Sequence, residues 1–489
     1  MHVALLVALA LPQRTLPLSV GIDLGTSNSC VAWTRADGTR ELVPRRDGGG
    51  LLTPSVCVVD GAGAPALCAP DAAPPRGAGI IRAWKRAVGL DAATAKWRLE
   101  DATRKRLRLD DGAGDADGWI GAAVPLEGGG AARARPEACA AAVIASLLDD
   151  CEAHCGARPD RAVVGVPACF LPSQREATER AAASCGLAKV QTANEPELAA
   201  HAHGVGAGGG DALALVFDLG GGTLDCSLVD VGGETRTMEV VATAGDLNLG
   251  GTDFTAALAR AENIDEAEAE RVKIALTTRK VAATAAGGNV TRSRLEACLD
   301  PLLERCADAA REAAYLGDAR LKGDAELMGS DAGKASTRAK RRKAERADRA
   351  ALEDLKKRAP GVRVTPPPGA RDVDDVVLVG AATKMPCVQR ALSRLTALSI
   401  ARRVDPDHAV ALGAAIRAEM NDAEVADDDA FVVVDAFKAE VLRHFYGGAA
   451  DGDDDDDDDD GDDDEVVEVD DAEFARLLAL AEAEDDEDD

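Results

Sequence analysis

The chain has 489 residues, of which 46% are hydrophobic but only 3% aromatic, and a formal net charge of -30. Most of this charge is local, because residues 451–489 hold 24 acidic side chains and one arginine, which leaves -7 for the first 450 residues. So modest a charge argues against a nucleic-acid partner. No segment approaches the 18 apolar residues that a membrane span needs, and the length suits two or more domains.

The N-terminus carries a short apolar run, residues 3–10, that ends like a signal-peptide cleavage site. No basic residue precedes the run, so we treat residues 1–19 as an extension and expect a cytoplasmic protein. The alternative is the endoplasmic reticulum or another organelle lumen, if residues 1–10 act as a signal peptide. Twelve cysteines without a CxxC pair indicate buried, reduced thiols and not a zinc site.

Two stretches 195 residues apart share one pattern: an apolar run, Asp-Leu-Gly, small or hydroxyl residues, and a second apolar run. They extend from Val20 to Val31 and from Leu215 to Leu228. Each predicts a β-hairpin whose glycines expose backbone amides to a phosphate oxygen, with the strand-end aspartate facing the site. A single glycine turn is usually only a turn, but two such hairpins facing each other predict a polyphosphate clamp.

The other elements are expected from hydrophobic periodicity. Residues 20–60 predict a β-meander, residues 79–110 a basic helical segment and residues 111–132 a glycine-rich loop. Further helices are expected at 136–148, 173–185, 265–280, 291–315 and 409–420, strands at 161–167, 190–194, 239–243 and 376–380, and a turn at 249–254. The polar stretch 321–370 contains a basic block at 338–343, which indicates an insertion or a solvated helix face more than a nuclear-localisation signal.

The C-terminal part divides into a linker-like segment, residues 421–449, and an acidic tail, residues 450–489. Eight consecutive aspartates from Asp453 predict disorder, because such a run cannot collapse on itself. Within the tail, apolar residues between Phe474 and Ala481 follow helical spacing and predict a short helix.

Nine ordered motifs make residues 20–420 resemble the ATPase domain of the seventy-kilodalton heat-shock protein family, the DnaK-type chaperones. The motifs are Gly21–Cys30, Thr53–Ser55, Lys85–Arg86, Val166–Ala168 with Ser173–Arg175, Asn194–Pro196, Phe217–Asp225, Gly245–Asp246 with Leu249–Gly251 and Asp253–Phe254, Val377–Gly380, and Asp405–Asp407 with Leu412–Ala414. The resemblance implies an α/β, two-lobed actin/hexokinase-like fold with duplicated β-sheet cores. Lobe I would comprise about residues 20–210 and 400–420, and lobe II about residues 211–399.

The resemblance also implies ATP and Mg2+ in the cleft between the lobes. Asp23 and Asp218 would flank the magnesium through water, which suits an ion that keeps its hydration shell. Lys85 would lie beside the γ-phosphate, where a cation offsets developing charge. The implied catalytic residues are Lys85, Asp23, Glu195, Asp218, Thr223 and Asp225. The implied nucleotide-binding residues are Gly25, Thr26, Ser27, Gly220, Gly221, Gly222, Thr223, Glu270, Lys273, Thr277, Gly380, Lys384 and Asp407.

The chain departs from the family pattern at several points. Leu171-Pro172 replaces a polar pair and is expected to stiffen the interlobe relay of Pro167 and Arg175. In the turn Gly380–Lys384, Ala381 replaces a glycine and Lys384 an arginine that stacks on the base, so the resemblance leaves adenine affinity open. The segment Asp253–Glu270, in the region that exchange factors grip, is short. The 54 residues after Asp435 are too few for a peptide-binding β-sandwich.

The resemblance therefore implies an ATP-hydrolysing chaperone that assists protein folding. Its implied partners are J-domain co-chaperones, nucleotide-exchange factors and unfolded clients. A non-hydrolysing nucleotide-binding regulator of chaperones or co-chaperones is the alternative. A small-molecule kinase on the same fold is disfavoured, because the chaperone-type relay and linker are recognisable.

Overall fold

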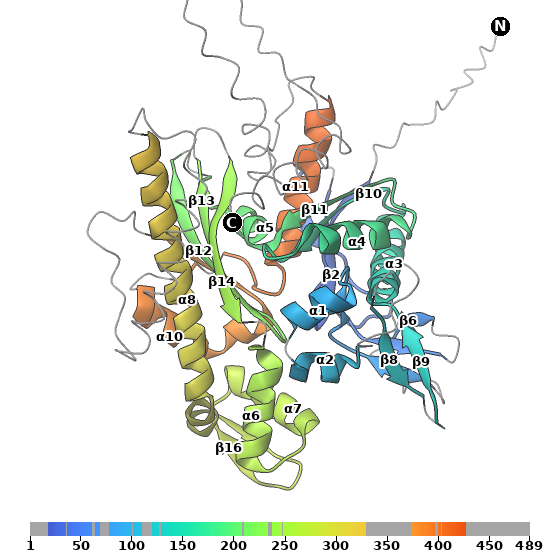
Figure 1. The fold of residues 1–489 in the computed structure, drawn as a ribbon, viewed down its shortest axis with the longest axis vertical. Helices are drawn as coiled ribbons and strands as arrows, with labels where there is room; N and C mark the ends of the chain where they lie inside the picture. Colours follow the sequence, from blue (N-terminus) through green and yellow to red (C-terminus); the bar gives the residue numbers. More distant parts are fainter. Residues whose placement is uncertain are drawn as a thin grey trace, which may run out of the picture. The chain divides into compact units, whose positions relative to one another are not determined.

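The computed structural model describes residues 18–426 apart from residues 36, 61–63, 69–77, 100, 110–119, 127–128, 208–209, 233–236, 247, 329–372, 397–399 and 402. The described part belongs to one compact unit (Figure 1). Residues 1–17, the basic block at 338–343, most of the linker-like segment and the acidic tail lie outside the described residues, so the predictions made for them stay predictions.

The first β-sheet has the strand order β11-β10-β1-β2-β3, with β4 added to β2. The chain runs antiparallel from β1 through β2 to β3, whereas β10 and β11 continue from β1 in parallel. The strands are β1 (Ser19–Asp23), β2 (Asn28–Thr34), β3 (Arg40–Leu42), β4 (Thr53–Pro54), β10 (Arg161–Val166) and β11 (Lys189–Asn194). Both the predicted meander and the strand at 161–167 are confirmed.

The second β-sheet has the order β14-β13-β12-β17-β18 and repeats the first sheet in both order and direction. Its antiparallel meander is β12 (Ala212–Leu219), β13 (Leu224–Val231) and β14 (Met238–Asp246), and its parallel continuation is β17 (Asp375–Val379) and β18 (Ile400–Ala401). The expected duplication of the β-sheet core is therefore present as topology. Because β18 pairs with β17, residues 400–401 belong to the second sheet and not to lobe I as expected.

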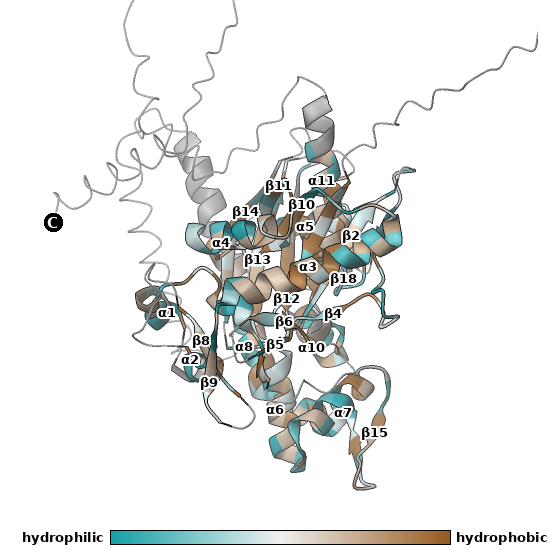
Figure 2. Ribbon diagram, turned by 90° about the vertical axis from the view of Figure 1, so that its right-hand side faces the viewer, coloured by the Kyte–Doolittle hydropathy of each residue, from teal (hydrophilic) through white to brown (hydrophobic). Residues whose placement is uncertain are grey.

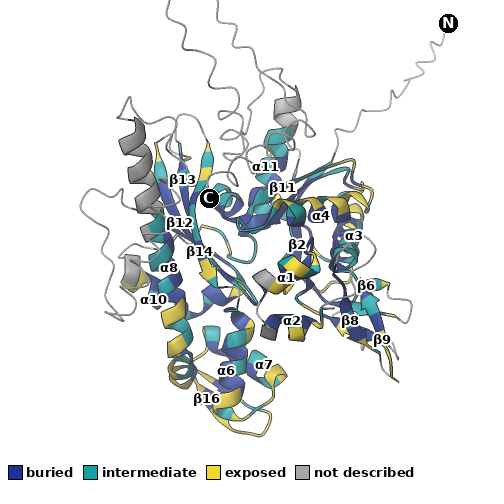
Figure 3. Ribbon diagram, viewed as in Figure 1, coloured by how far each residue is buried: buried dark blue, intermediate teal, exposed yellow. Residues whose placement is uncertain are grey.

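Helices cover the sheets and form the seam between them. α3 (Pro136–Cys155) and α4 (Pro172–Ala183) lie on the first sheet, and α6 (Gly251–Glu262), α7 (Glu266–Thr278), α8 (Arg292–Met328) and α10 (Pro386–Thr396) lie with the second. α5 (Glu195–His203) and α11 (Ala409–Ala426) pack against each other and against strands of both sheets. α11 runs six residues beyond the predicted end. Figure 3 shows the central strands of the second sheet, β12 and β13, as mostly buried, and Figure 2 shows hydropathy along the same ribbon.

The segment predicted to be helical over residues 79–110 is mostly something else. It holds strand β7 (Gly79–Ile81), a 3-10 turn at Trp84–Ala87, and two short helices, α1 (Ala92–Arg98) and α2 (Asp101–Leu107). Ala83 adopts a left-handed conformation with φ of 54°, which breaks any continuous helix. The basic composition suggested one helix, but the segment has no continuous helical periodicity. The buried side chain of Trp84 anchors it instead.

Small sheets complete the described part. β5 (Cys57–Val59) and β6 (Pro65–Leu67) pair beside β7, β8 (Ala122–Pro125) pairs with β9 (Ala131–Ala134), and β15 (Val281–Ala283) pairs with β16 (Asn289–Thr291). β8 and the start of β9 lie where a glycine-rich loop was expected. α6 begins at Gly251, inside the predicted turn at 249–254, so that prediction was wrong in its second half.

Two findings bear on the environment of the chain. Over the residues described, no helix combines the length and the apolar character of a membrane span. None of the twelve cysteines, all of them among the described residues, is in a disulfide, and seven are buried, which agrees with the expected reduced thiols.

Candidate functional site

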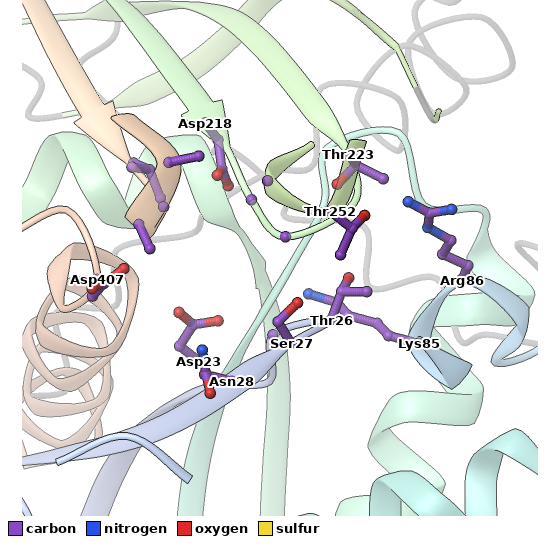
Figure 4. A pocket seen from close by; sticks show the side chains of 18 of the residues that line it. Asp23, Thr26, Ser27, Asn28, Lys85, Arg86, Asp218, Thr223, Thr252 and Asp407 are labelled. Atoms are coloured by element: carbon purple, nitrogen blue, oxygen red, sulfur yellow. The ribbon is translucent and has the colours of Figure 1, made fainter. Parts of the chain in front are cut away.

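The two Asp-Leu-Gly stretches form antiparallel hairpins whose turns face each other. Asp23 pairs with Cys30 across the first hairpin, and Asp218 pairs with Asp225 across the second. A β-carbon added to Gly221 would overlap the Ser27 Oγ, so the loops approach closely and only glycine fits there. Figure 4 shows Asp23 and Asp218 on opposite sides of the space between the hairpins.

This space is a cavity of about 830 Å3 between the two sheets, within the range of small-ligand sites. It brings together sixteen of the eighteen predicted site residues. They are Asp23, Gly25, Thr26, Ser27, Lys85, Glu195, Asp218, Gly220, Gly221, Thr223, Asp225, Glu270, Lys273, Thr277, Gly380 and Asp407. Gly222 and Lys384 are not among the lining residues.

Lys85 is held in the cavity by its local structure. Trp84 is buried and its Nε1 donates to the Ser55 carbonyl at 3.0 Å, which anchors the 3-10 turn. The Lys85 ammonium then reaches the Glu195 carboxylate, with 2.6 Å between Nζ and Oε1. Glu195 is the first residue of α5, so a strand-end helix fixes the carboxylate. Both side chains are buried, so Lys85 is not an exposed surface lysine.

Burial and mutual repulsion raise the pKa of the cleft carboxylates. Desolvation, then the charge of Glu195, raises the pKa of Asp23 to about 7 and that of Asp225 to about 6. The same causes hold the pKa of Asp218 well above its usual value. Burial alone would lower the Lys85 pKa, but the surrounding carboxylates outweigh it and the pKa is raised. These aspartates keep some contact with solvent through the cleft, yet protein surrounds them on most sides.

The donor set fits a hydrated magnesium ion. Carboxylates outnumber cationic groups around the cavity, so a dication would relieve their repulsion. Across the part of the chain that the structure describes, no three His, Cys, Asp or Glu side chains are grouped closely enough to hold a metal directly. Two aspartates acting through water, as expected for Asp23 and Asp218, agree with the preference of Mg2+ for keeping its waters.

The far end of the cavity is lined by helix α7. Lys273 Nζ donates to the Gly251 carbonyl at 2.8 Å, to Thr255 Oγ1 at 2.8 Å and to Glu270 Oε2 at 2.7 Å. Thr277 Oγ1 donates to the Lys273 carbonyl at 3.3 Å. The predicted nucleoside-binding residues of α7 therefore form one hydrogen-bonded group that fixes α7 to the first turn of α6.

The structure corrects the prediction for Lys384. Its Nζ lies 2.6 Å from Asp405 Oδ1 and 2.7 Å from Asp407 Oδ2. Two carboxylates therefore hold the ammonium, and of these only Asp407 lines the cavity. The charge of this lysine is satisfied by the segment between β18 and α11. Gly222 is also displaced from the lining, because its carbonyl accepts from Arg86 and a β-carbon on Gly250 would overlap it.

Sequence reasoning missed several residues at the site. Arg86, Thr252 and Asn28 line the cavity, as Figure 4 shows. Arg86 and Asn28 belong to motifs of the sequence analysis in which they were given no role, and Thr252 lies between two such motifs. Away from the cavity lining, Thr103 in α2 donates to Asn248 Oδ1 at 2.8 Å, and no sequence signal marked that contact. In the relay, Arg175 Nη2 donates to Asn194 Oδ1 at 2.6 Å, and Pro172 opens α4 at its first position, where proline removes no hydrogen bond.

Comparison with known proteins assigns the chain to a family. The model of the family described as Hsp70 protein matches residues 19–282 and 367–439, more than half of the chain. The chain belongs to the Hsp70 family. Members of the Hsp70 family have an actin/hexokinase-like ATPase fold. The two sheets of equivalent topology agree with that fold.

Two relatives illustrate the extent of the match. A "Chaperone protein DnaK" of Thermotoga petrophila is 31% identical over 437 residues, which cover 82% of this chain and 59% of that protein. The "Heat shock 70 kDa protein BIP3" of Oryza sativa subsp. japonica is 33% identical over 406 residues, covering 82% of this chain and 56% of that protein. The chain thus spans under two thirds of the length of these Hsp70 relatives.

Proposed function

We propose that this Hsp70-family chain binds Mg-ATP in the cleft and hydrolyses it, as an ATP-dependent chaperone that assists protein folding. The buried Lys85–Glu195 ion pair between two facing phosphate-type hairpins carries the proposal. A surface or purely structural lysine would not need to be desolvated beside four carboxylates.

The proposed roles of the cleft residues differ from one another. Thr26, Ser27, Gly220, Gly221 and Thr223 line the cavity and would bind phosphate oxygens through hydroxyls and amides. Lys85 offsets the charge that develops on the γ-phosphate as water displaces ADP. Glu195 and Asp225 order the attacking water, and the second of these has its pKa raised to about 6. Bound through water by Asp23 and Asp218, Mg2+ would neutralise phosphate charge.

Turnover of Mg-ATP by the purified chain, compared with Lys85→Ala, tests the proposal. We expect the variant to lose about a hundredfold or more in turnover, because one electrostatic contact to a developing charge contributes on that scale. Lys96→Ala, at an exposed lysine of α1, is the matched control and should turn over ATP like the wild type.

The outcome also separates the alternatives. If the wild type binds Mg-ATP but turns it over no faster than Lys85→Ala, the chain is a non-hydrolysing nucleotide-binding regulator. Stimulation of turnover by a J-domain protein would support the chaperone assignment, whereas stimulation by sugars would favour a kinase.

Partners and compartment belong to the same proposal. We propose J-domain co-chaperones, exchange factors and unfolded clients as partners, on the strength of family membership. The free, mostly buried cysteines support a reducing compartment such as the cytoplasm. Localisation of a C-terminal fluorescent fusion, with and without residues 1–10, would distinguish the cytoplasm from an organelle lumen.

A further inference from the structure

One face of α7 is turned into the cleft. Glu270, Lys273, Ile274 and Thr277 all line the cavity, and their spacing of three and four residues places them on one side of a helix. A neighbouring face of the helix, including Ala269, Val272 and Leu276, is buried in the core of the second sheet. The orientation of α7 therefore forces Ile274 toward the open cleft.

Ile274 is an unusual residue for such a place. Its exposure is 60%, the highest among the large apolar side chains that are exposed in the described part of the chain, and it is the one of these that lines the cavity. Leu51, Ile80 and Val281 are less exposed and lie elsewhere. Scattered exposed apolar residues need no explanation, but one on the wall of a ligand-sized cavity offers a surface for an apolar ligand face.

The η2 turn (Ala381–Lys384) supplies further apolar surface at this end of the cavity. Gly380, Ala381 and Ala382 line the cavity, and Ala381 is exposed. Lys384, from the same turn, cannot contribute a cation because Asp405 and Asp407 hold its ammonium. The η2 turn therefore contributes backbone atoms and methyl groups to the cavity wall.

The polar side chains near Ile274 are engaged with one another. Lys273 donates to three oxygens, one of them on Glu270, and Thr277 donates within the helix. Strong selection between bases requires buried polar groups that one base satisfies and another leaves unpaired. Glu266, also on the lining, is an exposed acceptor, and both purines carry N–H donors for it.

We infer that this site takes purine nucleotides as a class, holding the base by apolar contact with Ile274 and Ala381 and selecting little between adenine and guanine. The inference rests on the proposed function, since it concerns the base end of the same nucleotide site. Affinity would then come mainly from the phosphate hairpins and α7, with Ile274 as a residue that positions the base.

Calorimetric titration of the full chain with Mg-ADP, Mg-GDP, Mg-CDP and inorganic tripolyphosphate tests the inference. We expect the dissociation constants of Mg-ADP and Mg-GDP to agree within about fivefold. Mg-CDP should bind about tenfold more weakly, because its smaller ring covers less apolar surface. An Mg-ADP preference over Mg-GDP of fiftyfold or more would overturn the inference.

Variants locate the effect. Ile274→Ala should weaken Mg-ADP and Mg-GDP alike, by about tenfold, or ~1.4 kcal/mol, and leave tripolyphosphate unchanged. A merely structural role would weaken all three ligands together. Val281→Ala, at an exposed apolar residue off the cavity, is the control and should change none. If Ile274→Ala leaves both purine nucleotides unaffected, Ile274 does not contact the base and the inference is wrong.

The titrations also keep the two proposals apart. Binding of Mg-ADP with strong adenine selection, together with Lys85-dependent turnover, would overturn only the base inference. Equal binding of both purines without turnover would overturn only hydrolysis. If neither the nucleotides nor tripolyphosphate bind, both proposals fail.

Discussion

Glu195 lies 110 residues from Lys85 in sequence, yet its carboxylate and the lysine ammonium form the most enclosed charge pair of the cleft. Glu195→Gln would keep the shape of the side chain and remove its charge. We expect turnover to fall by about a hundredfold, because the water-ordering carboxylate and the partner of Lys85 are lost together. Mg-ADP affinity should change little. Single-turnover kinetics measure the loss of hydrolysis, and calorimetry measures the affinity separately. An unchanged turnover would remove Glu195 from the catalytic group.

A second residue makes the stability of the chain depend on pH. Burial, then the charge of Arg417, lowers the pKa of His201 in α5 from 6.5 to about 4. The unfolded chain therefore binds a proton at His201 that the folded chain does not bind between about pH 6.5 and pH 4, so the contribution of His201 to stability falls as the pH drops through that window. The raised pKa values of Asp23 and Asp225 act with the opposite sign, so only the difference between the wild type and a His201 variant isolates this loss. At pH 5 the loss is about 2 kcal/mol relative to neutral pH.

Chemical denaturation of the wild type and His201→Gln at pH 7.5 and pH 5 measures this loss. The variant cannot take up the proton, so its loss of unfolding free energy over the interval should be smaller by that amount. Equal losses in the two proteins would contradict the assigned burial of His201.

Single site residues could be predicted from the sequence where they belong to a motif whose place in the order of motifs implies a role. Lys85, Asp23 and Asp218 could be chosen because each belongs to an ordered motif, and the cavity brings them together. Lys384 could not be placed in this way. Its partners Asp405 and Asp407 belong to the crossover from β18 to α11, and only the tertiary fold brings that crossover beside η2.

At the scale of elements, a hydrogen bond from Thr103 to Asn248 connects α2 to the loop that follows β14 of the second sheet. We expect Thr103→Val to speed Mg-ADP release about fivefold, since a single neutral hydrogen bond contributes about 1 kcal/mol. Stopped-flow release of a fluorescent ADP analogue measures the rate.

Asn248→Ala and the double variant complete a cycle. The double variant should release nucleotide no faster than either single variant, because both lose the same bond. Fully additive effects would show that the two side chains act independently.

α11 depends on glycine for its packing. A β-carbon on Gly413 would overlap the backbone of Leu198 in α5, so the two helices approach as closely as their main chains allow. Gly413→Ala should lower the free energy of unfolding by about 2 kcal/mol or more through overpacking. Gly210→Ala is the matched control, because its β-carbon would meet no atom within 4 Å. Thermal unfolding of the two variants should differ clearly, and equal melting temperatures would contradict the close packing.

Elements were predictable where local pattern and tertiary environment agree. Alternating apolar residues and Asp-Leu-Gly turns predicted both hairpins, because the turn chemistry acts within a few residues. Residues 79–110 were misjudged for the opposite reason. Their short elements are held by distant partners, such as the Ser55 carbonyl that accepts from Trp84, and no local period records such contacts.

At the scale of the whole described body, a ligand in the cleft touches both sheets and should stabilise them together. Mg-ADP at about one hundred times its dissociation constant should stabilise the chain by about 2.7 kcal/mol. EDTA should remove most of this gain, because Mg2+ relieves the carboxylate repulsion that, after burial, raises the pKa values of Asp23 and Asp225. Calorimetric scans with ADP, with and without Mg2+, measure both effects. A shift insensitive to EDTA would exclude a metal from nucleotide binding.

Helix α5 connects the chemistry of the cleft to the far end of the seam. It begins at Glu195 and ends at His203, whose carbonyl accepts from Arg403 at 2.8 Å. Nine residues of helix span about 13 Å, and the helix rests on strands of both sheets. If the helix moves as a rigid body, a tilt of about 10° about Glu195 would displace the His203 end by roughly 2 Å over that length. This displacement would be transmitted to the segment before α11, because Arg403 in that segment donates to the His203 carbonyl.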